Sequence, residues 1–212
     1  MTINKLVIAS NNPGKLREIQ TLLSPLNVEV LTQASLNILE AEEPHFTFIE
    51  NALAKARHAS LHSGLAALAD DSGLCVQALH GRPGVYSARF ADMLDPENCV
   101  ESNADKIKRD EQNNQALLSA LAGQINRQAY YYCALVLVRQ HDDPQPIIAE
   151  GLWSGEILNE PKGSNGFGYD PLFLDIGLNQ TGAELDIDTK NRISHRGQAL
   201  QQLMIKIKAL NV

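Results

Sequence analysis

The stretch Leu6–Lys15, LVIASNNPGK, constrains the fold of this chain more than any other segment. A short apolar run gives way to small and amide residues, and apolar residues recur at helical spacing after Pro13-Gly14-Lys15. The pattern predicts a strand, a tight turn and a helix with a lysine in its first turn. Because a helix N-terminus offers N–H groups and a partial positive charge, the turn is a candidate phosphate site.

The side chains of the turn fit the same interpretation. Asn11 and Asn12 tolerate left-handed turn geometry and can donate hydrogen bonds, while Lys15 adds a full positive charge. The motif is neither GxxxxGK[ST] nor GxGxxG. An ordinary strand-to-helix turn with a solvated lysine is therefore the alternative.

Length and composition exclude several classes of protein. The 212 residues are enough for a substantial core in one or two domains. Apolar runs stay far below the ~20 residues that cross a bilayer, and the N-terminus lacks a signal-peptide pattern, so we expect a cytoplasmic protein without membrane contact. The net charge of −7 argues against binding a nucleic-acid polymer, but a small phosphorylated ligand needs only a few local cations.

The cysteines predict reduced thiols. Cys75, Cys99 and Cys133 are odd in number, widely spaced and outside any CxxC pattern. A disulfide framework or a zinc site is therefore not expected.

Predicted strands and helices alternate along the chain. We expect strands at 28–31, 65–69, 74–79, 130–139 and 146–153, and helices at 47–63, within 97–122, and after a capping Ser194. Thr47 followed by Glu50 is a capping-box pattern. Interleaved elements indicate an α/β protein, and two successive strands without a helix between them favour a mixed sheet. We expect one domain over residues 1–212, with two lobes around a substrate cleft.

Two groups of carboxylates are candidates for a metal site. Asp70 and Asp71 follow a predicted strand, and Glu42 and Glu43 lie in an acidic loop. Adjacent carboxylates repel each other unless cations or donors relieve them, and Mg²⁺ prefers one or two carboxylates plus phosphate oxygens. A solvated turn is the alternative, since Asp and Ser are common turn formers.

The segment 163–171, GSNGFGYDP, predicts a loop that can approach a ligand closely. Phe167 and Tyr169 offer flat faces for stacking on a base, and Asp170 is held extended by the following proline. A tight loop that packs its aromatic residues into the core is the alternative. Candidate cations elsewhere in the chain are Lys15, Lys55, Lys190 and Arg196, and each alone is commonly a surface charge.

Six segments occur in this order along the chain: SNNPGK (10–15), EEPHFTFIENALAKA (42–56), ADDSGL (69–74), GVYSARF (84–90), GFGYDPLF (166–173) and SHRGQAL (194–200). Together they resemble the inosine/xanthosine triphosphate pyrophosphatase family. The similarity spans essentially the whole chain. It implies hydrolysis of deaminated purine nucleoside triphosphates (ITP, dITP, XTP) to the monophosphate and pyrophosphate. It also implies a Mg²⁺ requirement, with one ion or more per subunit, a homodimer, and an elongated mixed sheet flanked by helices in two lobes.

The resemblance also implies roles for individual residues. The triphosphate would be held by Ser10, Asn11, Asn12, Pro13, Gly14, Lys15 and Lys55. Asp71 would be the proton acceptor and a metal ligand, and Glu42 the other ligand, with Glu43 an alternative. Ser72 would contact substrate. The base and sugar would be lined by Phe167, Gly168, Tyr169 and Asp170, and the base would be read by Lys190, His195 and Arg196. Asn11 stands where the family frequently has glycine, and 164–165 vary within a tolerant loop.

The sequence leaves open the identity of the proton acceptor, the basis of purine selection and two rival functions. Our hypothesis is that Asp71 orients or deprotonates the attacking water, but Asp70 or a metal-bound hydroxide could share that role. Donors facing the purine 6-oxo group, from Arg196 or backbone N–H groups, would be left unpaired against ATP. Two rivals are a Maf-type pyrophosphatase, which carries an arginine-rich N-terminal motif that SNNPGK lacks, and a non-catalytic nucleotide-sensing module. Neither the order of ITP, dITP and XTP nor Mg²⁺ against Mn²⁺ follows from the sequence.

Overall fold

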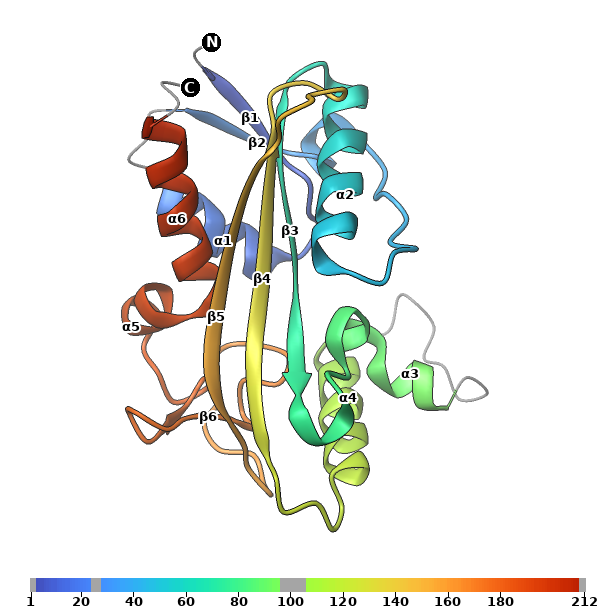
Figure 1. The fold of residues 1–212 in the computed structure, drawn as a ribbon, viewed down its shortest axis with the longest axis vertical. Coiled ribbons are helices and arrows are strands. Elements are labelled where there is room, and N and C mark those ends of the chain that lie inside the picture. The colour runs from blue at the N-terminus through green and yellow to red at the C-terminus, as the bar shows by residue number, and fades with distance from the viewer. Residues whose placement is uncertain (1–2, 24–27, 96–105, 210–212) are drawn as a thin grey trace. The chain divides into compact units, whose positions relative to one another are not determined.

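The computed structural model describes residues 3–23, 28–95 and 106–209 (Figure 1). Its strands form one sheet in the order β2-β1-β3-β4-β5-β6-β7. Their bounds are β1 (Lys5–Ile8), β2 (Glu29–Thr32), β3 (Ala66–Val76), β4 (Gln128–Val138), β5 (Ile147–Ile157), β6 (Phe173–Asp175) and β7 (Gln180–Thr181). β1 pairs in parallel with β2 and β3, whereas β6 pairs antiparallel with β5 and β7. The prediction of a mixed α/β sheet is therefore confirmed.

Six α-helices accompany the sheet in the described part of the chain. They are α1 (Pro13–Leu23), α2 (Phe48–Ser63), α3 (Phe90–Leu94), α4 (Lys106–Ala120), α5 (Ile187–Ile193) and α6 (His195–Ala209). Short 3₁₀ helices occur at Ala34–Leu36, Gln77–Leu79 and Gly84–Arg89. Among the helices described here, none combines the length and apolar character needed to cross a membrane.

The helix ends follow the capping signals in the sequence. Thr47 is the N-cap of α2, and its hydroxyl oxygen accepts the Glu50 N–H at 3.3 Å. Ser194 precedes α6, and its hydroxyl oxygen accepts the Gly197 N–H at 3.2 Å. Pro13 occupies the first position of α1, where a missing N–H does no harm. Both predicted caps are thus confirmed, while the part of the 97–122 prediction that precedes residue 106 lies outside the described residues.

β3 differs from the prediction. Two short strands separated by a turn at Asp70–Gly73 were expected, but one strand runs unbroken from Ala66 to Val76, and 77–79 form a 3₁₀ turn. Asp70 and Asp71 are buried inside this strand. Turn propensity fails here because cations from other elements satisfy both carboxylates, as described below. The short elements α5, β6 and β7 also escaped prediction, because they are too short to show a period.

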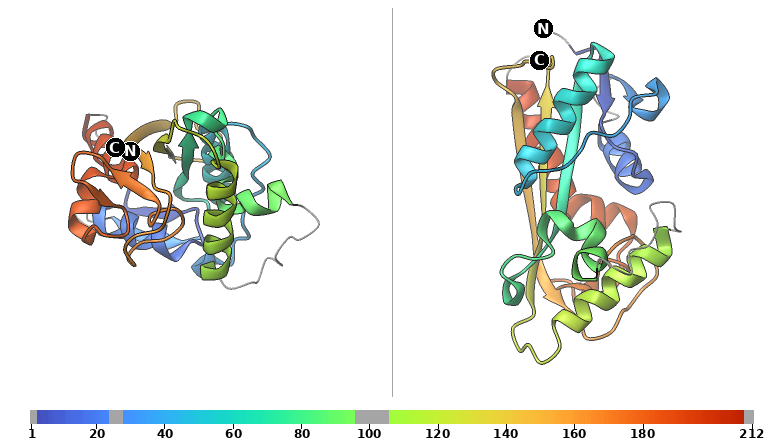
Figure 2. Two further views of the ribbon diagram at one scale, coloured as in Figure 1. Left: turned by 90° about the horizontal axis from the view of Figure 1, so that it is seen from below. Right: turned by 90° about the vertical axis from the view of Figure 1, so that its right-hand side faces the viewer.

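The chain divides into two compact units. The first comprises 1–72, 133–152 and 194–212. Alternate residues of its strands face two different hydrophobic clusters: Leu6 and Ile8 of β1 pack with α1 and α6, whereas Val7 packs with the alanines of α2. Figure 1 and the left view of Figure 2 show α2 and α6 on opposite sides of the sheet.

The second unit comprises 73–132 and 153–193. Its core contains Phe90, Leu117 and three aromatic rings packed together. The Phe173 ring lies 4.7 Å from the Tyr131 ring and 4.8 Å from the Trp153 ring, between centroids. Tyr169 of the predicted glycine-rich loop and Leu172, which follows the loop, belong to this core. The substrate cleft remains a prediction.

Replacing Gly151 of β5 with alanine is expected to destabilise the first unit. A Cβ at this position would lie 1.9 Å from the carbonyl oxygen of His195 and 2.7 Å from the Ala199 nitrogen, both backbone atoms of α6. Because backbone cannot step aside as a side chain can, we expect the free energy of unfolding to fall by about 1–3 kcal/mol or more. Denaturant unfolding measures the loss. The exposed Ser154→Ala on the same strand is the control, and equal stability of the two variants would contradict the close packing.

Candidate active site

Asp70 and Asp71 point to opposite faces of the sheet. Side chains alternate along a strand, and the neighbours of β3 fix the direction, since Leu68 packs with α1 and α6 while Ala69 packs with α2. Asp70 therefore shares the face of α1 and α6, and Asp71 the face of α2. Separation by the sheet relieves the repulsion that adjacency in the sequence suggests.

Asp70 is the centre of a buried ionic network on the first face, with no exposed side-chain surface. Its Oδ1 accepts hydrogen bonds from the Lys15 ammonium and, at 2.8 Å, from the Ser72 hydroxyl. Its Oδ2 accepts from Arg196 Nε at 2.8 Å and from the Cys133 thiol at 3.2 Å. Burial alone would raise the pKa of Asp70, but Arg196 and Lys15 outweigh it and hold that pKa well below its ordinary value. Asp70 is therefore a permanent anion that orders two cations.

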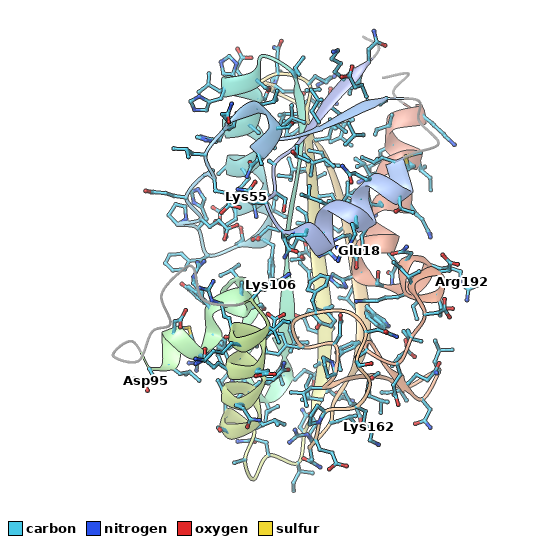
Figure 3. All side chains as sticks on the ribbon, turned by 180° about the vertical axis from the view of Figure 1, so that it is seen from behind. Glu18, Lys55, Asp95, Lys106, Lys162 and Arg192 are labelled. Carbon is cyan, nitrogen blue, oxygen red and sulfur yellow. The ribbon has the colours of Figure 1, made fainter. Side chains whose placement is uncertain are left out.

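Arg196 is held on three sides. Besides Asp70, its guanidinium donates to Glu18 on α1 and, at 2.9 Å, to the Ser72 hydroxyl. Burial alone would lower the pKa of Arg196, but the charges of Asp70 and Glu18 raise it. Figure 3 labels Glu18. The sequence analysis missed this residue, although it stands one helical turn after Lys15.

A second cluster surrounds Asp71 on the face of α2. Lys55, labelled in Figure 3, donates to Asp71 Oδ1 at 3.1 Å and to Glu43 Oε1 at 2.6 Å. Asn51 Nδ2 lies 3.3 Å from Asp71 Oδ2. Burial raises the pKa of Asp71, and Lys55 offsets part of that effect. Burial by itself would lower the pKa of Lys55, but the charges of Asp71 and Glu43 raise it.

Glu43 joins this cluster, whereas Glu42 is exposed to solvent. Asn51 fixes the acidic loop to α2, because its Oδ1 accepts the His45 N–H at 3.0 Å and its Nδ2 donates to the His45 carbonyl at 3.2 Å. Asn51 is not among the site residues expected from the sequence.

The donor set fits a hard divalent cation that also binds substrate. Across the described ranges, no group of three or more His, Cys, Asp and Glu side chains gathers around one point. Two carboxylates, Asp71 and Glu43, share Lys55. Mg²⁺ is commonly held by one or two carboxylates together with substrate phosphate oxygens and water. The residues present are therefore sufficient for such an ion only when a phosphorylated substrate completes its shell.

The turn 10–15 is arranged differently from the expectation. Asn12 acts as a cap, because its side-chain oxygen accepts the N–H groups of Gly14 at 3.0 Å and Lys15 at 3.4 Å. Ser10 Oγ accepts the Asn12 N–H at 3.2 Å. Neither asparagine of this turn adopts a positive φ. Because Asn12 already occupies the N–H groups of Gly14 and Lys15, the positive charge of the Lys15 side chain is the main feature of this turn that could bind an anion.

The loop 163–170 belongs to the second unit, and its aromatic residues have different environments. Phe167 is half-buried, while Tyr169 is buried in the core and donates its hydroxyl to the Ser87 carbonyl at 2.9 Å. The core alternative therefore describes Tyr169, whereas Phe167 stays partly exposed. Asp170 Oδ2 accepts the Phe167 N–H at 2.8 Å and the Lys190 ammonium at 2.6 Å.

The predicted site residues thus form groups within each unit. The first unit holds the 10–15 turn, Lys55, Asp71, Ser72 and the buried pair His195 and Arg196 at the start of α6. The second unit holds 167–170 and Lys190. Of the candidate carboxylates, Glu42 alone stands apart from the clusters described above.

Comparison with known proteins places this arrangement in a family. The Ham1 family model matches residues 6–206. The chain is 59% identical to the dITP/XTP pyrophosphatase of Nitrosomonas europaea over 202 residues, covering 95% of this chain and 93% of that protein. It is 55% identical to the dITP/XTP pyrophosphatase of Ralstonia nicotianae, covering 97% and 98% of the two chains. The solved structure of a HAM1 protein from Coxiella burnetii is similar with a TM-score of 0.85 and 44% identity, over 98% of this chain and 100% of that one. The chain belongs to the Ham1 family.

Proposed function

We propose that this protein hydrolyses deaminated purine nucleoside triphosphates, namely ITP, dITP and XTP, to the nucleoside monophosphate and pyrophosphate. Relatives named dITP/XTP pyrophosphatase at 55–59% identity, aligned over nearly their whole length, support this activity. Within the structure, the observation that carries it is the cluster that Asp71 of β3 forms with Lys55 of α2 and Glu43 of the acidic loop. The charge of Lys15 on α1 also lowers the pKa of Asp71. Such a set suits a polyanion that is attacked by water.

The cations address the charge of the substrate. A triphosphate carries about four negative charges that repel an incoming nucleophile and must be stabilised as pyrophosphate leaves. Lys15 and Lys55 are largely buried and each is oriented by a carboxylate. Fixed in this way, they bind the phosphates without further ordering and stabilise the leaving group.

A divalent cation, for which Mg²⁺ is the proposed identity, would be held by Asp71 and Glu43 in place of the predicted Glu42. When bound, it supplies positive charge that offsets the charge of the triphosphate. Lys55 donates to both carboxylates and offsets part of their negative charge.

Asp71 is the proposed proton acceptor for the water that attacks the α-phosphorus. Asp70 is unsuited to this role, because its oxygens already accept four hydrogen bonds and its side chain is inaccessible. Asp71 keeps a small exposed surface, 9% of its side chain. The structure thus favours Asp71 in the choice between the two carboxylates.

We assign contacts with the purine base first to the site residues of the second unit. Phe167 would stack on the base, Asp170 with Lys190 would fix the position of Phe167, and Ser72 and Gly168 are proposed to contact the substrate. His195 and Arg196 are proposed to donate to the 6-oxo group. The three bonds of Arg196 to protein use only part of its five N–H donors. Buried donors left unpaired against the adenine amino group would reject ATP.

A homodimer in the cytoplasm completes the proposal. The homodimer is supported by the resemblance to the family, whereas the cytoplasmic location is the expectation drawn from the sequence. Light scattering of the purified protein tests the dimer.

A substrate panel with pyrophosphate detection tests the activity. We expect release of pyrophosphate from ITP, dITP and XTP with Mg²⁺, little from ATP or pyrimidine triphosphates, and loss of activity when a chelator removes the metal. A nucleotide-sensing module would bind ITP without turnover, and a Maf-type enzyme would prefer pyrimidine substrates. Either result would refute the proposed function.

A further inference from the structure

The helix α4 carries a polar stripe that contacts the glycine-rich loop. Lys106, Asp110 and Asn114 stand at positions i, i+4 and i+8, which places them on one face of the helix. Figure 3 labels Lys106, the first residue of α4. Each of the three side chains reaches Phe167 or Gly168. The 106–114 stripe, as we call these three residues, played no part in the motifs found in the sequence.

Asp110 and Asn114 form hydrogen bonds with the two peptide groups on either side of Gly168. Asp110 Oδ2 accepts the N–H of Gly168 at 2.9 Å, and Asn114 Nδ2 donates to the carbonyl of Gly168 at 2.9 Å. Asn114 Nδ2 also donates to the Asp110 carbonyl at 2.8 Å, which ties the clamp to the helix itself. Burial raises the pKa of Asp110, and the Gly168 N–H offsets part of that effect.

The glycine-rich loop 163–170 is flexible by composition, so contacts from α4 are needed to order it. Gly163, Gly166 and Gly168 all have positive φ, at 81°, 76° and 63°. Glycine reaches these conformations easily but leaves them as easily, so a loop with three of them loses much entropy when it is fixed. Contacts that fix the loop before a ligand arrives reduce the free energy that ligand binding must supply.

Lys106, the third residue of the 106–114 stripe, contacts the ring of Phe167. Lys106 Nζ lies 4.7 Å from the centre of the Phe167 ring, and Lys190 Nζ lies 5.1 Å from it. Cations at this distance attract the ring through its negative face. The half-buried Phe167 is thereby held in place by two side chains while part of its surface stays accessible.

We propose that the 106–114 stripe presets the base platform, so that Asp110 and Asn114 are positioning residues for Phe167 and Gly168. This inference rests on the proposed function for the identity of the ligand. The stripe acts on binding of the purine and leaves the phosphates and the chemical step alone. Lys106 supports the same platform through the ring.

The test compares Asp110→Ala, Asp110→Asn and Asn114→Ala in the full-length protein. Because stacking of a base on an aromatic side chain contributes substantially to affinity, we expect Asp110→Ala and Asn114→Ala to raise KM for ITP about tenfold with kcat within about threefold. Asp110→Asn keeps an oxygen acceptor for Gly168 and is expected to restore most of the affinity. Inorganic tripolyphosphate, which has no base, should inhibit all variants equally.

Two variants on the same helix are matched controls. Glu111→Ala removes an exposed carboxylate next to Asp110 and should change nothing. Asn113→Ala removes bonds to Ala88 and Ala91 and should lower the melting temperature without the selective rise in KM. This second control separates a general loss of stability from a loss of positioning.

Hydrogen exchange gives a readout that needs no turnover. In Asp110→Ala, peptides that cover 163–170 should exchange faster, whereas in Glu111→Ala they should not. Unchanged exchange together with unchanged KM, or equal losses for ITP and tripolyphosphate, would overturn the role of the stripe. If the wild-type protein releases no pyrophosphate from ITP, the proposed function fails, while exchange and calorimetric binding of ITP in the presence of a chelator still decide the role of the stripe.

Discussion

Asp71→Asn is expected to lower kcat for ITP by about 10²–10⁴-fold. The substitution keeps the shape of the side chain and one of its two oxygen acceptors, so either Lys55 or Asn51 loses a hydrogen bond. It also removes the charge that would accept a proton and share a metal with Glu43. Steady-state pyrophosphate release across a range of ITP concentrations measures the effect. In the described structure the Asp71 side chain is partly exposed, whereas the Asp70 side chain is fully buried. Asp70 therefore cannot reach the attacking water in place of Asp71.

The control for this prediction is Asp142→Asn. Asp142 is an exposed carboxylate in the turn after β4, within the same unit, and its loss should leave kcat unchanged. Melting temperatures of both variants identify any loss of folded protein. Near-normal turnover by a folded Asp71→Asn protein would remove Asp71 from the chemical step.

Asp70→Asn is expected to have the largest effect on stability. The neutral amide cannot balance Arg196 and Lys15, which are buried against Asp70 in the first unit. Breaking a buried ion pair from one side leaves an uncompensated charge, which lowers the free energy of unfolding by about 3–5 kcal/mol. Denaturant unfolding, followed with the same probe as for Gly151→Ala, measures the change.

A double-mutant cycle with Arg196→Gln identifies the cause. If the loss reflects a stranded charge, the double variant should be more stable than the sum of the single losses predicts, by about 0.5–3 kcal/mol. Glu18, the other acidic partner of Arg196, limits the recovery, because it loses its own cation. Strictly additive losses would show that Asp70 and Arg196 contribute independently.

The local architecture was predictable from the sequence wherever a few neighbouring residues decide it. Thr47 and Glu50 cap α2, Ser194 caps α6, and the apolar run within 130–139 forms most of β4, because each of these signals lies in a few neighbouring residues. The motifs also predicted which residues carry charge at the candidate site. They did not predict β3, since the turn propensity of Asp70–Gly73 yields to ionic partners that lie far away in the sequence.

The tertiary structure alone decided which charged residues of the candidate site pair with each other. Lys15 and Asp70 are 55 residues apart, and Arg196 and Asp70 are 126 apart, so only packing of α1 and α6 on the sheet brings them together. The same packing selects Glu43 rather than Glu42 as the partner of Lys55, and it places Asp110 and Asn114 on the loop at Gly168. Propensity and period act between near neighbours. A carboxylate buried in a strand is tolerated only when distant elements bring cations to it, and no local pattern encodes that distance.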